Sequence, residues 1–144
     1  MMTLPKDFLD KKICILGMGY VGLTLGVAMA RAGFSIHGLE ISDDIVETLR
    51  KGKAHFWEKN LDIHLNQAIK KNSFTFSKDL NKTIEASVYI VTVGTPLDGE
   101  NRARLDMIQN AAKQISEHMQ NGALVILRST VKIGTTLKIE KILN

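Results

Sequence analysis

The feature that most constrains the fold is a glycine-rich turn joining a short apolar run to a longer one. Residues 17–22 read Gly-Met-Gly-Tyr-Val-Gly, a G-x-G-x-x-G pattern. The run before it, Lys12 to Gly17, is almost continuously apolar, as expected of a strand covered on both faces. The run after it, Tyr20 to Ala32, has the small and branched apolar residues of a packed helix, and Gly33 follows. Strand, glycine turn and helix in this order predict the start of a βαβ unit.

The rest of the chain continues the alternation of short β-branched runs and longer amphipathic ones. Further strands are expected at Phe34–Glu40, Phe74–Phe76, Ser87–Val93 and Ala123–Leu127, the last of them buried. Further helices are expected at Asp43–Lys51 behind an N-cap at Ser42, at Asn60–Lys71, Asp79–Glu85 and Asp106–Gln120, and from near Gly134 onward. This order predicts an α/β fold of the Rossmann type: a doubly wound, mostly parallel sheet with helices on both faces.

Composition supports one globular domain. The chain has 144 residues, of which 44% are hydrophobic and 24% charged, so it is neither disordered nor of low complexity. No apolar run approaches the roughly 20 residues of a membrane span, and the N-terminus lacks the pattern of a signal peptide. We therefore expect no membrane partner.

Charge and the titratable side chains narrow the partners. The net charge of +4 comes from scattered lysines rather than a basic stripe, which disfavours nucleic acid and fits a small anionic ligand. The four histidines form no pair at ligand spacing, so no metal site is expected. The single cysteine, Cys14, cannot form an internal disulfide, which favours a reducing compartment such as the cytoplasm.

The glycine turn predicts a dinucleotide site. Gly17 permits the tight turn, Gly19 lets a pyrophosphate approach the backbone, and Gly22 lets helix and strand pack closely. Glu40 ends the second predicted strand about 20 residues further on, where a carboxylate accepts the ribose hydroxyls of NAD and repels the extra phosphate of NADP. No arginine directly follows Glu40, so NAD is favoured over NADP. The alternative is a glycine turn used only for packing and a solvated acid at a strand end.

Two further segments lie at carboxyl ends of predicted strands, where open α/β sheets bind ligands. Gly94 and Thr95 follow the Ser87–Val93 strand, and Ser129 and Thr130 follow the Ala123–Leu127 strand. Taken alone, the first segment is equally a plain turn, and the second is equally a helix cap.

Taken in order, these segments resemble the N-terminal NAD-binding domain of the nucleotide-sugar dehydrogenases, the UDP-glucose and GDP-mannose dehydrogenase group. The resemblance runs through ICILGMGYVGLTLG, Glu40, HFWEKNL, IVTVGTPLD and VILRSTVKIGTT, nearly the whole chain. The glycine motif is common to many dehydrogenases. V-x-T-P combined with S-T-V-x-x-G-T is much more specific, and it argues against the hydroxyacid and 6-phosphogluconate dehydrogenases that share the same opening.

The resemblance implies a role for each matching position. Cofactor-binding residues would be the pyrophosphate loop and its neighbours along the cofactor: Gly17, Gly19, Tyr20, Val21, Gly22, Glu40, Gly94, Thr95 and Ser129. Thr130 would be catalytic, positioning a water or the reacting oxygen. Glu58 matches a recurrent glutamate whose role stays open, a solvated acid being the alternative. Ile45 stands where many members carry Arg or Lys against the adenosine, which implies a looser hold on that part of the cofactor.

The resemblance also implies an enzyme that is incomplete in this chain. The family oxidises the primary alcohol of a nucleotide sugar to a carboxylate by two hydride transfers to NAD, for polysaccharide precursors, with a cysteine that traps the aldehyde. Cys14 sits in the middle of a strand and does not replace that cysteine. We therefore expect residues 1–144 to be the NAD-binding domain, with the central and C-terminal UDP-sugar-binding domains lying outside it.

Three expectations about substrate and assembly remain. The segments HFWE and TPLD favour a UDP-N-acetylhexosamine over UDP-glucose as the substrate. Full-length members of the family form dimers largely through the missing region, so residues 1–144 alone are expected to be monomeric. The alternative in another functional class is a non-catalytic module that senses NAD.

Overall fold

The computed structural model describes residues 10–80, 86–100 and 104–144. Five strands form one sheet: β1 (Lys12–Leu16), β2 (Ser35–Leu39), β3 (Phe74–Ser77), β4 (Val88–Val91) and β5 (Leu124–Leu127). The helices are α2 (Tyr20–Arg31), α3 (Asp43–Arg50), α4 (Leu61–Lys70), α5 (Asp106–Ser116) and α6 (Thr135–Leu143). The alternation expected from the sequence is therefore confirmed, with most boundaries shifted by one to four residues.

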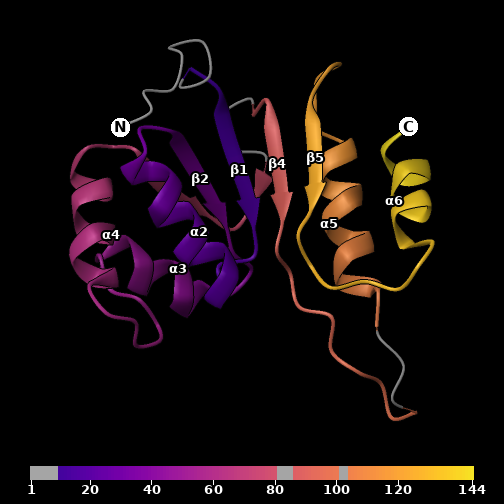
Figure 1. Ribbon diagram of the computed structural model, residues 1–144, viewed down its shortest axis with the longest axis horizontal. Helices are drawn as coiled ribbons and strands as arrows, with labels where there is room; N and C mark the ends of the chain where they lie inside the picture. Colours follow the sequence, from indigo (N-terminus) through magenta and orange to yellow (C-terminus); the bar gives the residue numbers. More distant parts are fainter. Residues whose placement is uncertain (1–9, 81–85, 101–103) are drawn as a thin grey trace.

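The sheet has the order β3-β2-β1-β4-β5, and all of its strand pairs are parallel. The chain builds outward from β1 through β2 to β3, then crosses to the other side of β1 to add β4 and β5. In Figure 1, α2, α3 and α4 lie beside one half of the sheet, and α5 and α6 beside the other. This is the doubly wound arrangement. The order in which strands are added reverses between β1 and β4, and such sheets bind ligands at that point.

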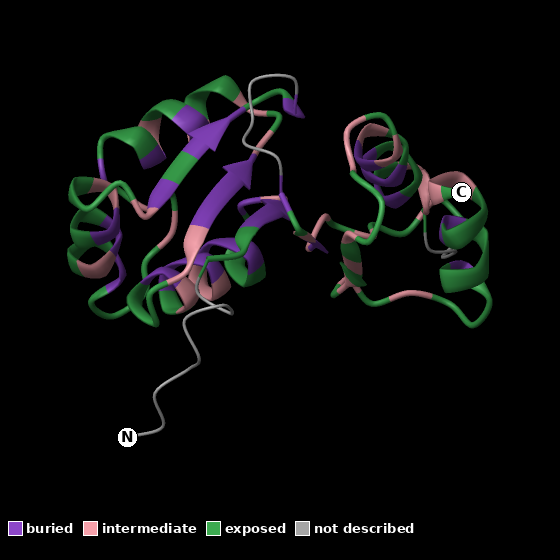
Figure 2. Ribbon diagram, turned by 90° about the horizontal axis from the view of Figure 1, so that it is seen from above, coloured by how far each residue is buried: buried purple, intermediate pink, exposed green. Residues whose placement is uncertain are grey.

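Successive residues along the strands point to opposite faces of the sheet and pack in two separate cores. Ile13, Ile15 and Phe74 pack in one core with the buried residues of α2, α3 and α4. Cys14 and Tyr89 pack in the other core, against Ala111 and Ile115 of α5. Figure 2 shows the buried residues concentrated along the strands and on the helix faces toward them. Both faces of the central strands are thus covered, which accounts for their almost continuous apolar sequence.

Local signals set the helix ends. The hydroxyl oxygen of Ser42 accepts a hydrogen bond from the Ile45 N–H at 3.5 Å, and Asp43 and Asp44 occupy the first turn of α3. Gly52 follows that helix with φ of 75°. The helix begins at the predicted N-cap because the cap side chain and the first-turn acids compensate its unpaired N–H groups.

One prediction about the strands is wrong. The Ala123–Leu127 segment was expected to form a buried strand, but β5 is the last strand of the sheet, and its Leu124 and Ile126 side chains are 55% and 38% exposed. A strand at the edge has a neighbour on one side only, and one face of β5 is left uncovered. The predicted helix Asp79–Glu85 falls mostly outside the described residues. Within the described ranges no helix is long and apolar enough to cross a membrane.

Candidate cofactor-binding site

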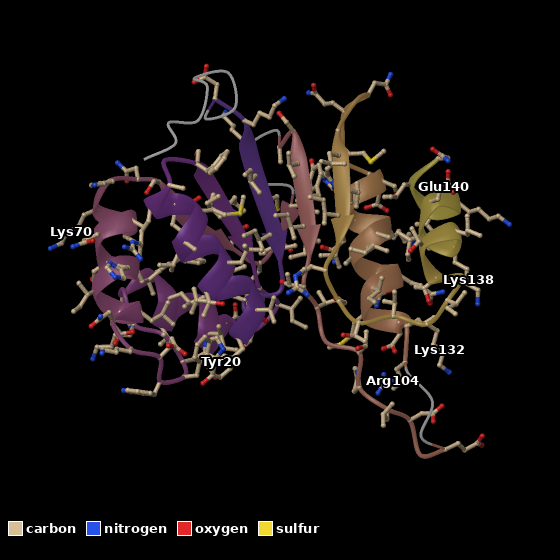
Figure 3. The ribbon with its side chains drawn as sticks, viewed as in Figure 1. Tyr20, Lys70, Arg104, Lys132, Lys138 and Glu140 are labelled. Atoms are coloured by element: carbon tan, nitrogen blue, oxygen red, sulfur yellow. The ribbon has the colours of Figure 1, made fainter. Side chains whose placement is uncertain are left out.

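A cavity of about 340 Å³ lies at the carboxyl ends of β1, β2 and β4, at the point where the strand order reverses. This volume falls within the usual range for small-molecule sites. The strand ends, the glycine turn and α5 all contribute to the wall, which consists of Leu16, Gly17, Gly19, Leu39, Glu40, Ile41, Thr92, Val93, Gly94, Met107, Asn110, Ala111 and Gln114. Figure 3 places Tyr20, the first residue of α2, at the edge toward which the strands point.

The three glycines of the turn have three distinct environments. Gly17 has φ of 95°, a conformation that favours glycine, and its N–H donates to the Leu39 carbonyl at 2.8 Å. A Cβ on Gly22 would collide with the Gly17 carbonyl oxygen and lie 2.6 Å from the Thr92 hydroxyl. A Cβ on Gly19 would meet no atom within 4 Å. Packing therefore explains Gly22 but not Gly19, which borders open space in the cavity wall.

Helix α2 begins at the cavity wall, and no side chain among the described residues caps the N–H groups of its first turn. Gly19 is the N-cap of α2, no side chain in the described structure caps the helix, and its first turn carries no acid. The free N–H groups and the positive end of the helix dipole suit a phosphate. The open space at Gly19 would admit one close to the backbone, so these residues fit the pyrophosphate of a dinucleotide.

Glu40 lies where β2 runs into the cavity wall, and its carboxylate is fixed by the backbone. Its two oxygens accept hydrogen bonds from the Met18 N–H at 3.0 Å and the Ser42 N–H at 3.1 Å. The Glu40 N–H donates in turn to the Ser77 carbonyl at 3.0 Å. A carboxylate held beside the glycine turn suits the ribose hydroxyls next to a pyrophosphate.

Three predicted residues of the turn, Tyr20, Val21 and Gly22, do not line the cavity. The Tyr20 ring stacks on that of Phe56 with centroids 4.0 Å apart, and its hydroxyl donates to the Trp57 carbonyl at 3.1 Å. Val21 is 46% exposed on the surface of α2. Glu58, in the same segment as Phe56, is exposed and accepts from the N–H of the adjacent Lys59 at 3.2 Å.

Of the residues predicted after β4 and β5, some lie in the cavity wall and some outside it. Gly94 lines the cavity, whereas Thr95, Ser129 and Thr130 do not. The Ser129 hydroxyl donates to the Val93 carbonyl at 2.7 Å, which ties the end of β5 to the end of β4. Thr130 is exposed one residue further on.

The wall also contains residues that the sequence analysis missed. Ile41, Met107, Asn110 and Gln114 face the cavity from the end of β2 and from α5. Asn110 and Gln114 are four residues apart on α5 and so lie on one side of the helix. This spacing was visible in the sequence, but which polar side of α5 faces the cavity depends on how the helix packs on the sheet.

Two buried groups have shifted pKa values, both in the sheet and outside the cavity wall. Burial raises the pKa of the Cys14 thiol to about 12, so this buried thiol stays protonated and is a poor nucleophile. Burial, together with the nearby Arg50 cation, lowers the pKa of His37 to about 4. The imidazole of His37 lies between the hydroxyls of Thr75 (2.9 Å) and Ser77 (2.8 Å).

Comparison with known proteins points to one family. Residues 11–144 match the profile of the UDP-glucose/GDP-mannose dehydrogenase family, NAD binding domain. The chain is 35% identical over 131 residues to the UDP-N-acetyl-D-mannosamine dehydrogenase of Campylobacter jejuni, covering 90% of this chain and 31% of that protein. It is 31% identical over 135 residues to a UDP-glucose 6-dehydrogenase of Bacillus subtilis, covering 93% and 29%.

Solved structures agree with this assignment. The UDP-D-ManNAc dehydrogenase of Pyrococcus horikoshii superposes with a TM-score of 0.88 at 30% identity, over 92% of this chain and 31% of that one. A ternary complex of GDP-mannose dehydrogenase from Pseudomonas aeruginosa gives a TM-score of 0.84 at 25% identity, over 91% and 31%. The chain therefore spans about a third of the length of the relatives that it matches.

Proposed function

Since the chain belongs to the UDP-glucose/GDP-mannose dehydrogenase family as its NAD-binding domain, we propose that it holds the cofactor of an enzyme that oxidises a UDP-sugar. The proposed reaction takes the C6 alcohol of the sugar to a carboxylate, for the synthesis of polysaccharide precursors in the cytoplasm. NAD, when bound, would accept the hydride in each of two oxidation steps. The observation that carries the proposal is a cavity at the strand switch point, bordered by the open backbone of Gly19 and by the Glu40 carboxylate.

The residues of this chain bind and orient the cofactor in this proposal. Gly19 and the first turn of α2 hold the pyrophosphate through their backbone, because the N–H groups there are free of side-chain caps. Gly17 contributes the shape of the turn, since its own N–H is bonded to the Leu39 carbonyl. Glu40 accepts hydrogen bonds from the hydroxyls of the adenosine ribose. Ile41 and the side chains of α5 would hold the adenine, with the amides of Asn110 and Gln114 as hydrogen-bond partners for its polar edge.

The other predicted residues act on the opposite side of the cofactor. Gly94 lines the cavity at the end of β4, and Thr95 follows it. Ser129 and Thr130 follow β5, the neighbouring strand, so all four residues leave the sheet at its carboxyl edge. We assign Thr95 and Ser129 to the nicotinamide side and Thr130 to positioning of the reacting oxygen. Because Thr95, Ser129 and Thr130 do not line the cavity, the substrate-binding region of a longer protein would have to complete this part of the site.

The substrate proposal rests on the relatives. Several of them are UDP-N-acetyl-D-mannosamine dehydrogenases, in agreement with the preference for a UDP-N-acetylhexosamine drawn from HFWE and TPLD. We assign the UDP-sugar site, the trapping cysteine and the dimer contacts to regions equivalent to the two thirds of the relatives that this chain does not cover. Residues 1–144 alone bind NAD without turnover in this account.

A chimera tests the proposal. Residues 11–144 replace the matching domain of the Campylobacter jejuni relative, and formation of reduced nicotinamide is followed with UDP-N-acetylmannosamine, UDP-N-acetylglucosamine and UDP-glucose. We expect turnover with a UDP-N-acetylhexosamine, and none from residues 1–144 alone. A chimera with Gly19→Val, whose side chain would fill the open space at the turn, is the inactive control. A folded chimera that binds NAD but oxidises none of these sugars would contradict the proposal that this chain holds the cofactor of a UDP-sugar dehydrogenase.

A further inference from the structure

Thr92, which lies in the IVTVGTPLD segment but was given no role by the sequence analysis, joins three parts of the cofactor site. It follows the last residue of β4, and its N–H donates to the Leu16 carbonyl at the end of β1, at 2.9 Å. Its hydroxyl lies within hydrogen-bond distance of two carbonyls, Leu16 at 3.0 Å and Gly17 at 2.8 Å, which share its single proton. The same hydroxyl lies 2.6 Å from where a Cβ on Gly22 would stand. One side chain therefore contacts the end of β1, the glycine turn and the first helical turn of α2.

The Gly17 carbonyl depends on this hydroxyl. It points into the turn, where a Cβ on Gly22 would collide with it, and it has no backbone N–H partner among the described residues. Gly17 is half-buried, and a carbonyl packed against the start of α2 in this way loses a hydrogen bond when its donor is removed. Removing the Thr92 hydroxyl therefore favours a rotation of the peptide between Gly17 and Met18, which would bring its carbonyl to another donor or to water.

That peptide is held on its other side by Glu40. The Met18 N–H, which belongs to the same peptide plane as the Gly17 carbonyl, donates to a Glu40 carboxylate oxygen at 3.0 Å. The plane is thus fixed at both ends, by the Thr92 hydroxyl and by the Glu40 carboxylate. The next residue is Gly19, the open N-cap of α2. The orientation of this one peptide sets where the free N–H groups of the helix start point.

We propose that Thr92 is a positioning residue that holds the glycine turn in the shape that binds the cofactor pyrophosphate. This inference rests on the proposed cofactor function and deepens it. Thr92 acts through the Gly17–Met18 peptide and not through contact with the reacting atoms. Preorganisation of this kind raises affinity because the turn does not have to be ordered when the ligand binds.

The test separates the hydroxyl from the rest of the side chain. Thr92→Val keeps the shape and removes the hydroxyl, while Thr92→Ala and Thr92→Ser differ from each other by the hydroxyl alone. NAD affinity is measured by calorimetry well below the unfolding midpoint of each variant, and the midpoints are measured without ligand. Thr48→Val is the matched control, because the one bond of the Thr48 hydroxyl among the described residues stays within α3, to the Asp44 carbonyl at 2.7 Å.

We expect Thr92→Val and Thr92→Ala to bind NAD roughly tenfold more weakly than the wild-type chain. Thr92→Ser restores most of the affinity, and Thr48→Val binds like the wild type. A Thr92→Ala variant that binds NAD as tightly as Thr92→Ser, whatever its unfolding midpoint, would overturn the inference and leave Thr92 a structural residue. Failure of the wild-type chain to bind NAD would instead contradict the proposed function.

Discussion

At the scale of single residues, Gly19 and Gly22 appear identical in the motif and differ in the structure. A Cβ on Gly22 would enter the space of the Gly17 carbonyl and the Thr92 hydroxyl, whereas a Cβ on Gly19 would enter open cavity. Gly19 has φ of −70° and ψ of −164°, which any residue can adopt. The backbone therefore does not require glycine at position 19, and the ligand proposed for the cavity does.

Two alanine variants separate these roles. We expect Gly22→Ala to lower the free energy of unfolding by roughly 1–3 kcal/mol, because the added methyl group overpacks the turn. Gly19→Ala leaves the thermal unfolding midpoint close to that of the wild type and weakens NAD binding more than tenfold, because the methyl group occupies the space of the pyrophosphate. Thermal melts and calorimetric titrations of both variants measure these effects. Unchanged NAD affinity in Gly19→Ala would place the pyrophosphate elsewhere.

The Glu40 carboxylate makes a second prediction at this scale. Glu40→Gln removes the charge that attracts the ribose hydroxyls and repels a phosphate on the ribose, so NAD binding weakens by about tenfold and the preference over NADP narrows. Competition titrations with the two cofactors measure the ratio. Glu47→Gln is the control, since Glu47 is exposed on α3 and paired with Lys51 at 3.8 Å. An unaltered ratio in Glu40→Gln would argue against contact with the ribose.

At the scale of elements, β2 and β3 are linked by a series of side-chain hydrogen bonds as well as by the backbone hydrogen bonds of the sheet. The Ser77 hydroxyl donates to the Asp79 carbonyl at 3.0 Å, so the Nε2–H of His37 donates to the Ser77 hydroxyl. In the neutral ring Nδ1 then accepts from the Thr75 hydroxyl. This arrangement requires a neutral imidazole. Protonating Nδ1 would remove the acceptor that Thr75 uses and would place a charge near Arg50 in a buried site.

The series predicts how stability depends on pH. The pKa of His37 falls from 6.5 to about 4 on folding, so the unfolded chain takes up a proton that the folded chain does not between those values. The stabilisation is complete above pH 6.5 and is lost as the pH falls toward 4, at about 1.4 kcal/mol per pH unit and roughly 3 kcal/mol in total. Urea unfolding of the wild type and of His37→Gln across this range measures it. Parallel pH profiles for the two proteins would contradict the assignment.

The elements also show where sequence reasoning succeeds and where it stops. β1 and α2 were predicted to within a residue or two because periodicity and the glycine turn are local signals. The prediction that β5 is buried was wrong. Leu124 and Ile126 are apolar like core residues, and only the position of β5 in the sheet shows that one face of this strand has no neighbour. The assignment of Tyr20 and Val21 to the cofactor came from the motif and stays a prediction, since neither residue lines the cavity.

At the scale of the whole molecule, the strand order makes the site. Gly17, Glu40 and Gly94 are far apart in sequence, and they meet because β1, β2 and β4 are neighbours with their carboxyl ends at one edge. The sequence predicted these residues from their places after strands. The sequence did not predict the contributions of α5 and Thr92 to the site, because these depend on how the helix and the end of β4 pack in three dimensions.

The buried thiol gives a prediction about the molecule as a whole. Cys14 is 1% exposed in the central strand, and burial raises its pKa to about 12. We expect it to react with a thiol reagent only when the sheet opens, so that its rate of modification follows global unfolding and not local motion. Alkylation measured with increasing urea, against an unfolded control, tests this. Rapid modification of the folded chain would show that β1 is not in the stable part of the sheet.

The most direct test of the account is a calorimetric titration of the chain with NAD and, separately, with NADP. The account predicts saturable binding of one NAD per chain and at least tenfold weaker binding of NADP, because the extra phosphate would meet the Glu40 carboxylate at the end of β2. Equal affinity for the two cofactors, or a preference for NADP, would contradict the role of Glu40. Binding of neither would contradict the claim that the cavity at the strand switch point is a working cofactor site.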